Sequence, residues 1–296
     1  MTAAGPSLRP RPTLCGRPVP TDRALVMAIV NRTPDSFYDR GSYFSGDAAL
    51  ARVDAAVAEG ADVIDVGGVK AGPGQEVDAE EEIRRTVPFI AEIRRRHPGL
   101  LISVDTWRAS VAEQAVEAGA DLVNDTWAGA DPDLVRAAAA TGAGLVCSHT
   151  GGAQPRTRPH RVRYPDIVGQ VRDHLSRAAD GALAAGVRAD GIVIDPTHDF
   201  GKNTHHGLAL LRDVDVLVKT GWPVLMALSN KDFIGETLGV GLDDRVEGTL
   251  AATALAAHGG ARLFRVHEVA ATRRVVEMVA SIDGHRPPSR TVRGLA

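Results

Sequence analysis

The sequence predicts a (β/α)8 barrel, because eight short apolar runs alternate with eight helical patterns along one chain of 296 residues. The apolar runs end in Gly, Asn, Asp or Thr, and a helical pattern follows each of them. Such a barrel takes about 250 residues, which this chain can supply as a single domain. The main alternative, an open doubly wound sheet, is disfavoured because no dinucleotide-binding fingerprint follows the first apolar run.

The runs and patterns define the expected elements. We expect parallel strands at Leu25–Val30, Val63–Val66, Leu101–Asp105, Leu122–Asn124, Gly144–Cys147, Ile192–Asp195, Val224–Leu228 and Leu263–Val266. We expect helices at Ala48–Glu59, Glu76–Arg96, Ala109–Ala118, Asp133–Ala140, Asp166–Ala185, His205–Lys219, Asp243–His258 and Ala270–Ile282. The first helix stops at Gly60, and the second runs from acidic residues to Arg94, Arg95 and Arg96, an order that suits the helix dipole.

The chain divides into three regions. Residues 1–20 form an N-terminal tail and capping segment, residues 21–285 form the single barrel domain, and residues 286–296 form a C-terminal tail. Within the first region, Leu14–Val19 has the pattern of a short extended segment with a Gly/Pro turn. We expect this segment to cap the bottom of the barrel.

Composition and charge exclude several classes of protein. The hydrophobic fraction of 44% supports a sizeable core, and the formal net charge of -3 gives no basic field for nucleic acid. Met1–Pro20 lacks the apolar core of a signal peptide, and no apolar run reaches the roughly 20 residues that cross a bilayer. Cys15 and Cys147 lie far apart and form no metal or disulfide pattern. We therefore expect a cytoplasmic protein without nucleic-acid or membrane partners.

Polar side chains stand where the expected strands finish, which is the end of a barrel that carries its chemistry. Two carboxylates and an amide suit the edge of a flat heterocycle, and three basic groups suit an anion. They are Asp105, Asn124 and Asp195 in the first set, and Lys231, Arg265 and His267 in the second. Each residue alone could be a helix cap or a solvated loop residue, whereas their convergence on one rim indicates a binding site.

The loop after the second strand, Gly67–Gly74, is rich in glycine. Glycines allow close backbone approach, and backbone N–H groups in such loops can cradle a phosphate. No phosphate-binding motif is matched, so a plain connection and a ligand-binding loop stay equally open from this loop alone.

Several motifs follow one another in a recognisable order. They are Asn31–Phe37 (Asn-x-Thr-Pro-Asp-Ser-Phe), Ser103–Thr106 (Ser-Val-Asp-Thr), Asn124-Asp125, Ile194–Pro196 with Phe200–Lys202, Ser229–Gly235 (Ser-x-Lys-x-Phe-Ile-Gly) and Arg265–His267. Together they resemble the dihydropteroate synthase family over nearly the whole chain. The resemblance is highly specific for fold and family and less specific for activity.

The resemblance implies a chemistry and a set of site residues. Family members join 4-aminobenzoate to a dihydropterin that carries a methyl pyrophosphate, and Mg2+ assists the departure of pyrophosphate. This substitution needs a fixed pterin, a neutralised leaving group and a positioned amine. By matching motif, the pterin would contact Asp105, Asn124, Asp195 and Lys231. The pyrophosphate would contact Arg265 and His267, and the metal would contact Asn31. The aminobenzoate side of the site would be lined by Phe200, Ser229 and Pro73. Lys231 would be the catalytic residue of an active enzyme, and the C-terminal helices would form a homodimer.

The loop Gly67–Gly74 departs from the family pattern Gly-Gly-Glu-Ser-Thr-Arg-Pro-Gly. Ala71 and Gly72 stand where the family has Thr and Arg, while the flanking glycines and Pro73 remain. Loss of a charged donor that acts on a leaving group costs on the order of 10²- to 10³-fold in rate. We therefore expect a pterin-binding protein whose synthase activity is lost or greatly weakened, with weak binding of pterins or of sulfonamide- and sulfone-type ligands.

Other loops depart from the family as well. Asn230 replaces an arginine, and Asp232 is expected to place a carboxylate beside Lys231, where it would compete with a ligand for that charge. The segment Ser148–Thr157, after the fifth strand, also differs from the family form.

An active synthase with an unusual loop remains the alternative, because six motif positions persist. In that case Lys70, Arg32 or Arg40 would have to compensate for the lost arginine, and Lys70 lacks the bidentate fork of a guanidinium. A pterin-dependent methyltransferase domain is a weaker third hypothesis, because the chain has no space for a cobalamin module.

Overall fold

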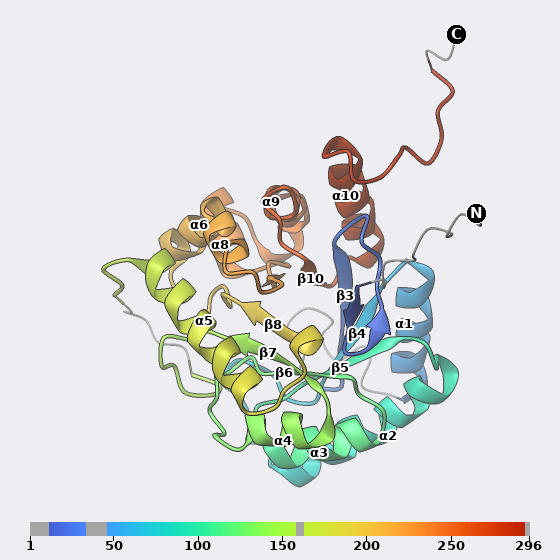
Figure 1. The fold of residues 1–296 in the computed structure, drawn as a ribbon, viewed down its shortest axis with the longest axis vertical. Helices are drawn as coiled ribbons and strands as arrows, with labels where there is room; N and C mark the ends of the chain where they lie inside the picture. Colours follow the sequence, from blue (N-terminus) through green and yellow to red (C-terminus); the bar gives the residue numbers. More distant parts are fainter. Residues whose placement is uncertain (1–11, 34–45, 158–162, 294–296) are drawn as a thin grey trace, which may run out of the picture.

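The computed structural model describes residues 12–33, 46–157 and 163–293. Eight parallel strands form one sheet in the order β8-β7-β6-β5-β4-β3-β10-β9, and the sheet curls into a barrel ringed by helices (Figure 1). The strands are β3 (Leu25–Asn31), β4 (Val63–Gly67), β5 (Leu101–Asp105), β6 (Leu122–Asn124), β7 (Gly144–Ser148), β8 (Ile192–Asp195), β9 (Leu225–Met226) and β10 (Leu263–Val266). The predicted (β/α)8 barrel is confirmed.

The barrel closes at a narrow seam between β8 and β9. An isolated parallel bridge joins Ile194 to Val224, and the Ile194 N–H donates to the Pro223 carbonyl at 2.9 Å. This short pairing explains why β9 has only two residues, although the sequence predicted a strand over 224–228.

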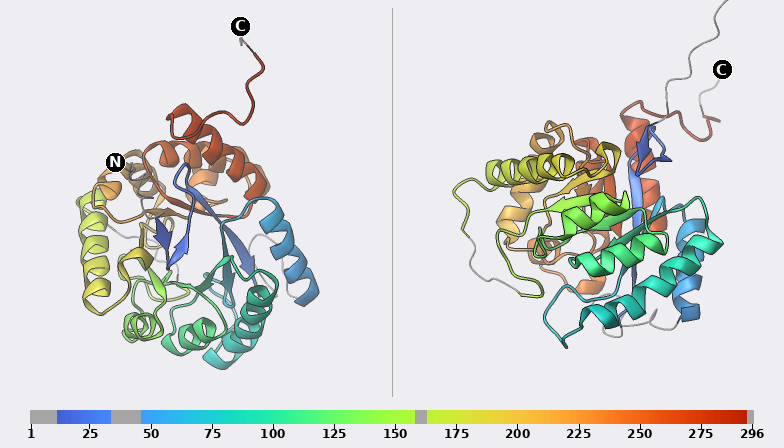
Figure 2. Two further views of the ribbon diagram at one scale, coloured as in Figure 1. Left: turned by 45° about the vertical axis from the view of Figure 1, so that its right-hand side comes forward. Right: turned by 60° about the horizontal axis from the view of Figure 1, so that its bottom comes forward.

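The helices cover the outside of the barrel, as the turned view in Figure 2 shows. They are α1 (Gly46–Ala58), α2 (Ala79–Arg96), α3 (Ala109–Glu117), α4 (Leu134–Thr141), α5 (Ile167–Ala184), α6 (Thr204–Arg212), α7 (Val214–Val218), α8 (Asp232–Leu238), α9 (Val246–His258) and α10 (Val269–Ile282). None of the helices in the described ranges has the length and apolar character needed to span a lipid bilayer.

Two helical features differ from the prediction. The pattern predicted over 205–219 divides into α6 and α7 at Asp213, whose φ of −106° and ψ of 31° are not helical. The short helix α8 was not predicted. The Asp232 N–H at its start donates at 2.6 Å to a carboxylate oxygen of Asp199, which lies in a different loop. A cap that comes from a distant segment leaves no local sequence signal.

The N-terminal hairpin closes the bottom of the barrel, as predicted. Strands β1 (Thr13–Leu14) and β2 (Arg17–Pro18) pair antiparallel around a turn. Leu14 and Cys15 are buried in a cluster with the first residues of several barrel strands, among them Leu25, Leu101 and Leu263. The hairpin therefore plugs the amino-terminal end of the barrel, and the opposite end is left for ligands.

Gly144, the first residue of β7, packs so closely against the N-terminal hairpin that there is no space for a side chain at this position. A Cβ at this position would lie 2.6 Å from the Cys15 sulfur and 2.6 Å from the Gly191 carbonyl oxygen. We expect Gly144→Ala to lower the free energy of unfolding by about 1–3 kcal/mol, because the backbone must shift to relieve the overlap. Urea unfolding followed by circular dichroism measures the change.

The matched control is Gly181→Ala on α5, where an added Cβ would meet no atom within 4 Å. There the same substitution should leave stability unchanged or raise it by about 0.5–1 kcal/mol, because Gly is a poor helix former. Equal stability of the two variants would contradict the proposed packing of the hairpin.

Candidate functional site

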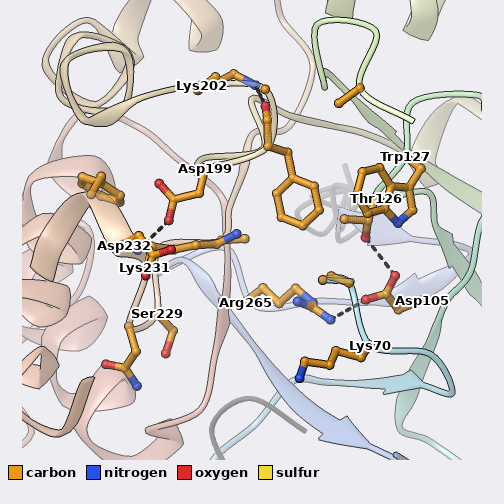
Figure 3. Close-up of a pocket in the computed structure, with 18 of the residues that line it drawn as sticks. Lys70, Asp105, Thr126, Trp127, Asp199, Lys202, Ser229, Lys231, Asp232 and Arg265 are labelled. Carbon is orange, nitrogen blue, oxygen red and sulfur yellow. Dashed lines mark hydrogen bonds and ion pairs between the residues drawn. The ribbon is translucent and has the colours of Figure 1, made fainter. Parts of the chain in front are cut away.

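A cavity of about 500 Å³ opens at the carboxyl end of the barrel strands (Figure 3). Most of the residues predicted for the site line this cavity: Asn31, Asp105, Phe200, Ser229, Lys231, Arg265 and His267. Asn124, Asp195 and Pro73 are not among the lining residues. Asn124 and Asp195 are buried at the ends of β6 and β8, with 2% and 4% of their surfaces exposed. The structure therefore brings most of the predicted residues together around one cavity and buries Asn124 and Asp195 at the neighbouring strand ends.

Arg265 on β10 forms the centre of the site. Its Nε donates to a carboxylate oxygen of Asp65 at 2.6 Å, and its Nη2 donates to Asp105 at 2.6 Å. Asp65 is fully buried on β4 and also accepts from the Asn124 amide at 3.3 Å. Arg265, predicted to bind pyrophosphate, is thus already paired with two carboxylates.

Asp65 was missed by the sequence analysis. An aspartate in the middle of the buried run Val63–Val66 was the available signal, because a buried carboxylate requires an ionic or hydrogen-bonding partner. The partner itself, Arg265, lies 200 positions further along the chain and could not be inferred from local pattern.

Asp105 combines an ion pair with an unusual affinity for a proton. Burial raises the pKa of Asp105 to about 6, against the opposing effect of the Arg265 charge. The Thr126 hydroxyl donates to its second oxygen at 2.8 Å. Burial also raises the pKa of Asp195, whose carboxylate accepts from the Thr197 backbone N–H at 2.7 Å. Both carboxylates are therefore held in fixed orientations at the ends of their strands.

Lys231 is held against the wall of the cavity. Its Nζ donates to the His198 carbonyl at 2.9 Å and lies 4.5 Å from the centre of the Phe200 ring. Phe200 in turn packs edge-on against Trp127, with ring centroids 4.9 Å apart. Burial lowers the pKa of Lys231, and the carboxylate of Asp199 opposes this shift most strongly.

Asp232 acts on the charge of Lys231, as expected, but it is not the main carboxylate that does so. Asp232 is exposed and forms an ion pair with Arg245 at 2.9 Å. Among the carboxylates that act on Lys231, Asp199 and Asp195 have larger effects than Asp232. Figure 3 shows Asp199 close to Lys231, on the same loop after β8 that carries Lys202.

Lys202 forms hydrogen bonds to the loops after β7 and β8, a role that was not predicted from the sequence. Its Nζ donates to the carbonyls of His149, Thr197 and Phe200 at 2.6, 3.1 and 3.0 Å. Burial lowers the pKa of Lys202 to about 7, with Asp195 opposing. Because three carbonyl groups accept from this ammonium, Lys202 stabilises the loops after β7 and β8.

Ser229, His267 and Glu268 form a polar cluster at the other side of the cavity. The Ser229 hydroxyl lies 2.9 Å from Nδ1 of His267 and 3.1 Å from a carboxylate oxygen of Glu268. Asn230 donates to the second oxygen of Glu268 at 3.0 Å. Burial lowers the pKa of His267 to about 4, against the opposing charge of Glu268, so the imidazole is neutral at neutral pH.

The loop after β4, in which Ala71 and Gly72 replace the family Thr and Arg, faces the cavity. Val69, Lys70, Ala71 and Gly72 all line it. Lys70, one of the three residues that could replace the missing arginine, lines the cavity, and Figure 3 places it on the same side as Asp105 and Arg265.

Arg32 lies elsewhere, with its guanidinium 4.9 Å from the centre of the Phe89 ring on α2. Arg40 falls outside the described residues, as do Pro34–Phe37 of the first motif and the adjoining Tyr38 and Asp39.

Comparisons with known proteins agree with this geometry. The profile of a family described as "Pterin binding enzyme" matches residues 27–267. The chain is 70% identical to "Inactive dihydropteroate synthase 2" of Mycobacterium leprae, over 96% of this chain and 99% of that protein. It is 38% identical to the dihydropteroate synthase of Bacillus subtilis, over 87% of this chain and 88% of that enzyme.

Solved structures give the same picture. Rv1207 of Mycobacterium tuberculosis matches with a TM-score of 0.74 and 56% identity, covering 93% of this chain and 99% of that one. The Yersinia pestis dihydropteroate synthase in a sulfonamide drug complex matches with a TM-score of 0.87 and 34% identity, again covering 93% and 99%.

The raised pKa of Asp105 predicts how Asp105→Asn changes the pH dependence of folding. Between the ordinary value of 3.8 and the folded value of about 6, the folded protein holds a proton that the unfolded chain releases. This stabilising contribution is fully present below pH 3.8 and is lost as the pH rises through about 6. The stability of the wild type minus that of Asp105→Asn should therefore increase as the pH falls from 7 to 4. Urea unfolding of both proteins across this range measures it, and a constant difference would contradict the prediction.

Proposed function

This chain belongs to the pterin-binding enzyme family, and from that premise we propose a dihydropteroate-synthase-like protein that binds pterin-type ligands and has lost synthase activity. The observation that carries the proposal is the loop after β4, whose cavity-lining residues Ala71 and Gly72 bring neither a hydroxyl nor a guanidinium to the site. Relatives at 70% and 68% identity that are named inactive favour this function over an active synthase.

The binding half of the site supports retention of a pterin. Asp105 and Lys231 line the cavity and offer a carboxylate and an ammonium to the donor and acceptor edge of such a ring. Asn124 and Asp195 lie at strand ends below the cavity, and Asn124 pairs in register with Asp105. We propose that Asp105 and Lys231 make the main contacts with the pterin and that Asn124 and Asp195 support them. These four residues are called the pterin floor.

The catalytic half of the site supports loss of turnover. A departing pyrophosphate requires groups that bind negative charge more strongly as it develops. Arg265 is paired with two carboxylates, and His267 is a neutral imidazole at neutral pH. The loop also lacks the Thr-Arg pair of the family, so the leaving group loses that hydroxyl and that guanidinium.

Magnesium would depend on the ligand for most of its coordination. No group of three or more His, Cys, Asp or Glu side chains that could hold a metal exists within the described ranges. Asn31 lines the cavity and offers a single amide oxygen, a ligand type that Mg2+ accepts. We therefore propose that Asn31 contributes to Mg2+ binding only when a pyrophosphate group supplies further oxygens, and we assign the ion no step.

The cysteines support a reducing compartment. Cys15 and Cys147 are both free and buried. Burial raises the pKa of each thiol to about 12, so neither is a reactive thiolate. We propose a cytoplasmic location on this basis.

Restoring the loop tests the proposed cause of inactivity. The wild type should bind 6-hydroxymethylpterin by calorimetry and show no turnover with the pterin pyrophosphate, Mg2+ and 4-aminobenzoate. The double substitution Ala71→Thr with Gly72→Arg should raise turnover by on the order of 10²-fold above the assay background, because it returns a charged donor to the leaving group.

The control for the restored loop is Ala71→Thr with Gly72→Gln, which adds a long side chain without its charge and should gain much less. Turnover by the wild type at the rate of ordinary synthases would refute the loss of activity. Equal gains in the two double variants would refute the role assigned to the guanidinium.

An apolar patch on α9 and α10 supports the homodimer expected from the family. These helices pack side by side, and Leu255, Met278 and Ile282 are 65%, 62% and 68% exposed. The buried side of α9, which includes Ala252, faces the barrel and so does not account for Leu255. We propose that the patch forms a two-fold interface between copies of the chain.

The substitution Leu255→Glu tests this interface, because it places a charge at the centre of an apolar contact. We expect the wild type to elute as a dimer and the variant as a monomer in size-exclusion chromatography with light scattering. Leu183→Glu on α5, where Leu183 is 44% exposed, is the matched control and should remain dimeric. A wild type that is monomeric at high concentration would contradict the proposal.

A further inference from the structure

The loop after β7 brings a guanidinium beside Gly72, the residue that stands where the family has arginine. Arg156 lies in this loop, and its Nε–H donates to the Gly72 carbonyl at 3.4 Å. Gly72 lines the cavity from one side, and Ala153 and Thr157, close to Arg156 in sequence, line it from the other. Arg156 is not itself a lining residue, and its guanidinium lies next to Gly72 and between lining residues of its own loop.

Arg156 differs from two other basic groups of the site, whose charges already have partners at the end of the barrel. Arg265 donates to Asp65 and Asp105, and Lys202 donates to three backbone carbonyls. The Nε–H is only one of the donors of the Arg156 guanidinium, and its remaining N–H groups make no hydrogen bond within 12–33, 46–157 and 163–293. These donors are free to meet an acceptor from a ligand.

Gly151, which precedes Arg156 in the loop after β7, lies close to Tyr164. The Tyr164 hydroxyl donates to the Gly201 carbonyl at 2.8 Å, and a Cβ on Gly151 would lie 2.0 Å from that hydroxyl. Arg156 itself has a φ of 62°, a left-handed conformation that is uncommon for a residue other than glycine. Strained backbone of this kind persists where surrounding contacts hold it, and it often positions a functional side chain.

We propose that Arg156 forms an oxyanion-binding subsite with the rebuilt loop after β4 and binds the anionic substituent of a pterin-type ligand. The proposal rests on the pterin-binding function proposed above and adds the residue that recognises the charged part of the ligand. Phosphate and carboxylate groups share the chemistry that a guanidinium fork recognises, because both present two oxygens to parallel N–H donors. The subsite concerns affinity, and it does not restore the lost donor of the chemical step.

Calorimetric titrations of the full chain test the subsite. The proteins are the wild type, Arg156→Gln, Arg156→Lys, and Arg136→Gln as the matched control, since Arg136 is exposed on α4 and its substitution removes the same charge. The probes are neutral 6-hydroxymethylpterin, its pyrophosphate ester, pteroate, and inorganic pyrophosphate alone.

The subsite predicts that Arg156→Gln weakens binding of the anionic probes by about tenfold, the usual effect of one lost charge-assisted contact. Arg156→Lys should lose less, and Arg136→Gln should match the wild type. Binding of 6-hydroxymethylpterin should be the same in all four proteins, which also reports that the variants are folded. Weakening of the pyrophosphate ester only, or of pteroate only, would identify the phosphate or the carboxylate as the group recognised.

The two proposals fail in different ways. If 6-hydroxymethylpterin does not bind the wild type, the pterin-binding function is refuted, and the inorganic pyrophosphate titration still decides whether Arg156 binds an oxyanion. If Arg156→Gln binds every anionic probe as the wild type does, the subsite is refuted while the pterin floor stands. Equal weakening in Arg156→Gln and Arg136→Gln would also refute the subsite, because it would reflect net charge alone.

Discussion

The pairing of Arg265 with Asp65 and Asp105 is the interaction on which the site depends. One guanidinium and two carboxylates meet inside the barrel, and they join β10 to β4 and β5. Removing one partner of a buried ion pair typically costs about 3–5 kcal/mol, because the remaining charge is left without compensation. The same contact fixes the orientation of Asp105 and opposes the rise in its pKa that burial causes. The ion pairs that join the strands at this end of the barrel are therefore the same ion pairs that orient Asp105 in the proposed pterin floor.

The fold was predictable because its signal is repeated and local. Leu101–Asp105, Leu122–Asn124, Ile192–Asp195 and Leu263–Val266 were predicted with their observed bounds, since each apolar run ends abruptly at a polar or helical segment. Helix α8 was not predictable in the same way, because its first N–H is capped by Asp199 from another loop. Local patterns thus describe the elements, whereas contacts between loops add elements that have no sequence signature of their own.

The site was predictable as a set of residues and much less so as an arrangement. Family motifs identified seven residues that line the cavity, including Lys231 and Arg265. The motifs could not show that Arg265 is paired with Asp65, or that the Lys202 ammonium donates to three backbone carbonyls. These partners come from strands and loops far apart in the chain, so their geometry exists only after the barrel closes. The shifted pKa values of the site residues arise from burial and from neighbouring charges, which the folded barrel brings together.

Separate segments carry ligand binding and the chemical step, which explains how one can be lost without the other. The proposed pterin floor includes Asp105 at the end of β5 and Lys231 at the start of α8, and an ion pair of the barrel holds Asp105 in place. The leaving-group donors of the family belong to the loop after β4, where Ala71 and Gly72 now stand. A loop can change without disturbing the strands, because few buried contacts connect the two. Interactions that act only in the transition state contribute little to ground-state affinity, so their loss abolishes turnover and leaves binding largely intact. A protein altered in this loop is therefore suited to hold a pterin-type ligand without consuming it.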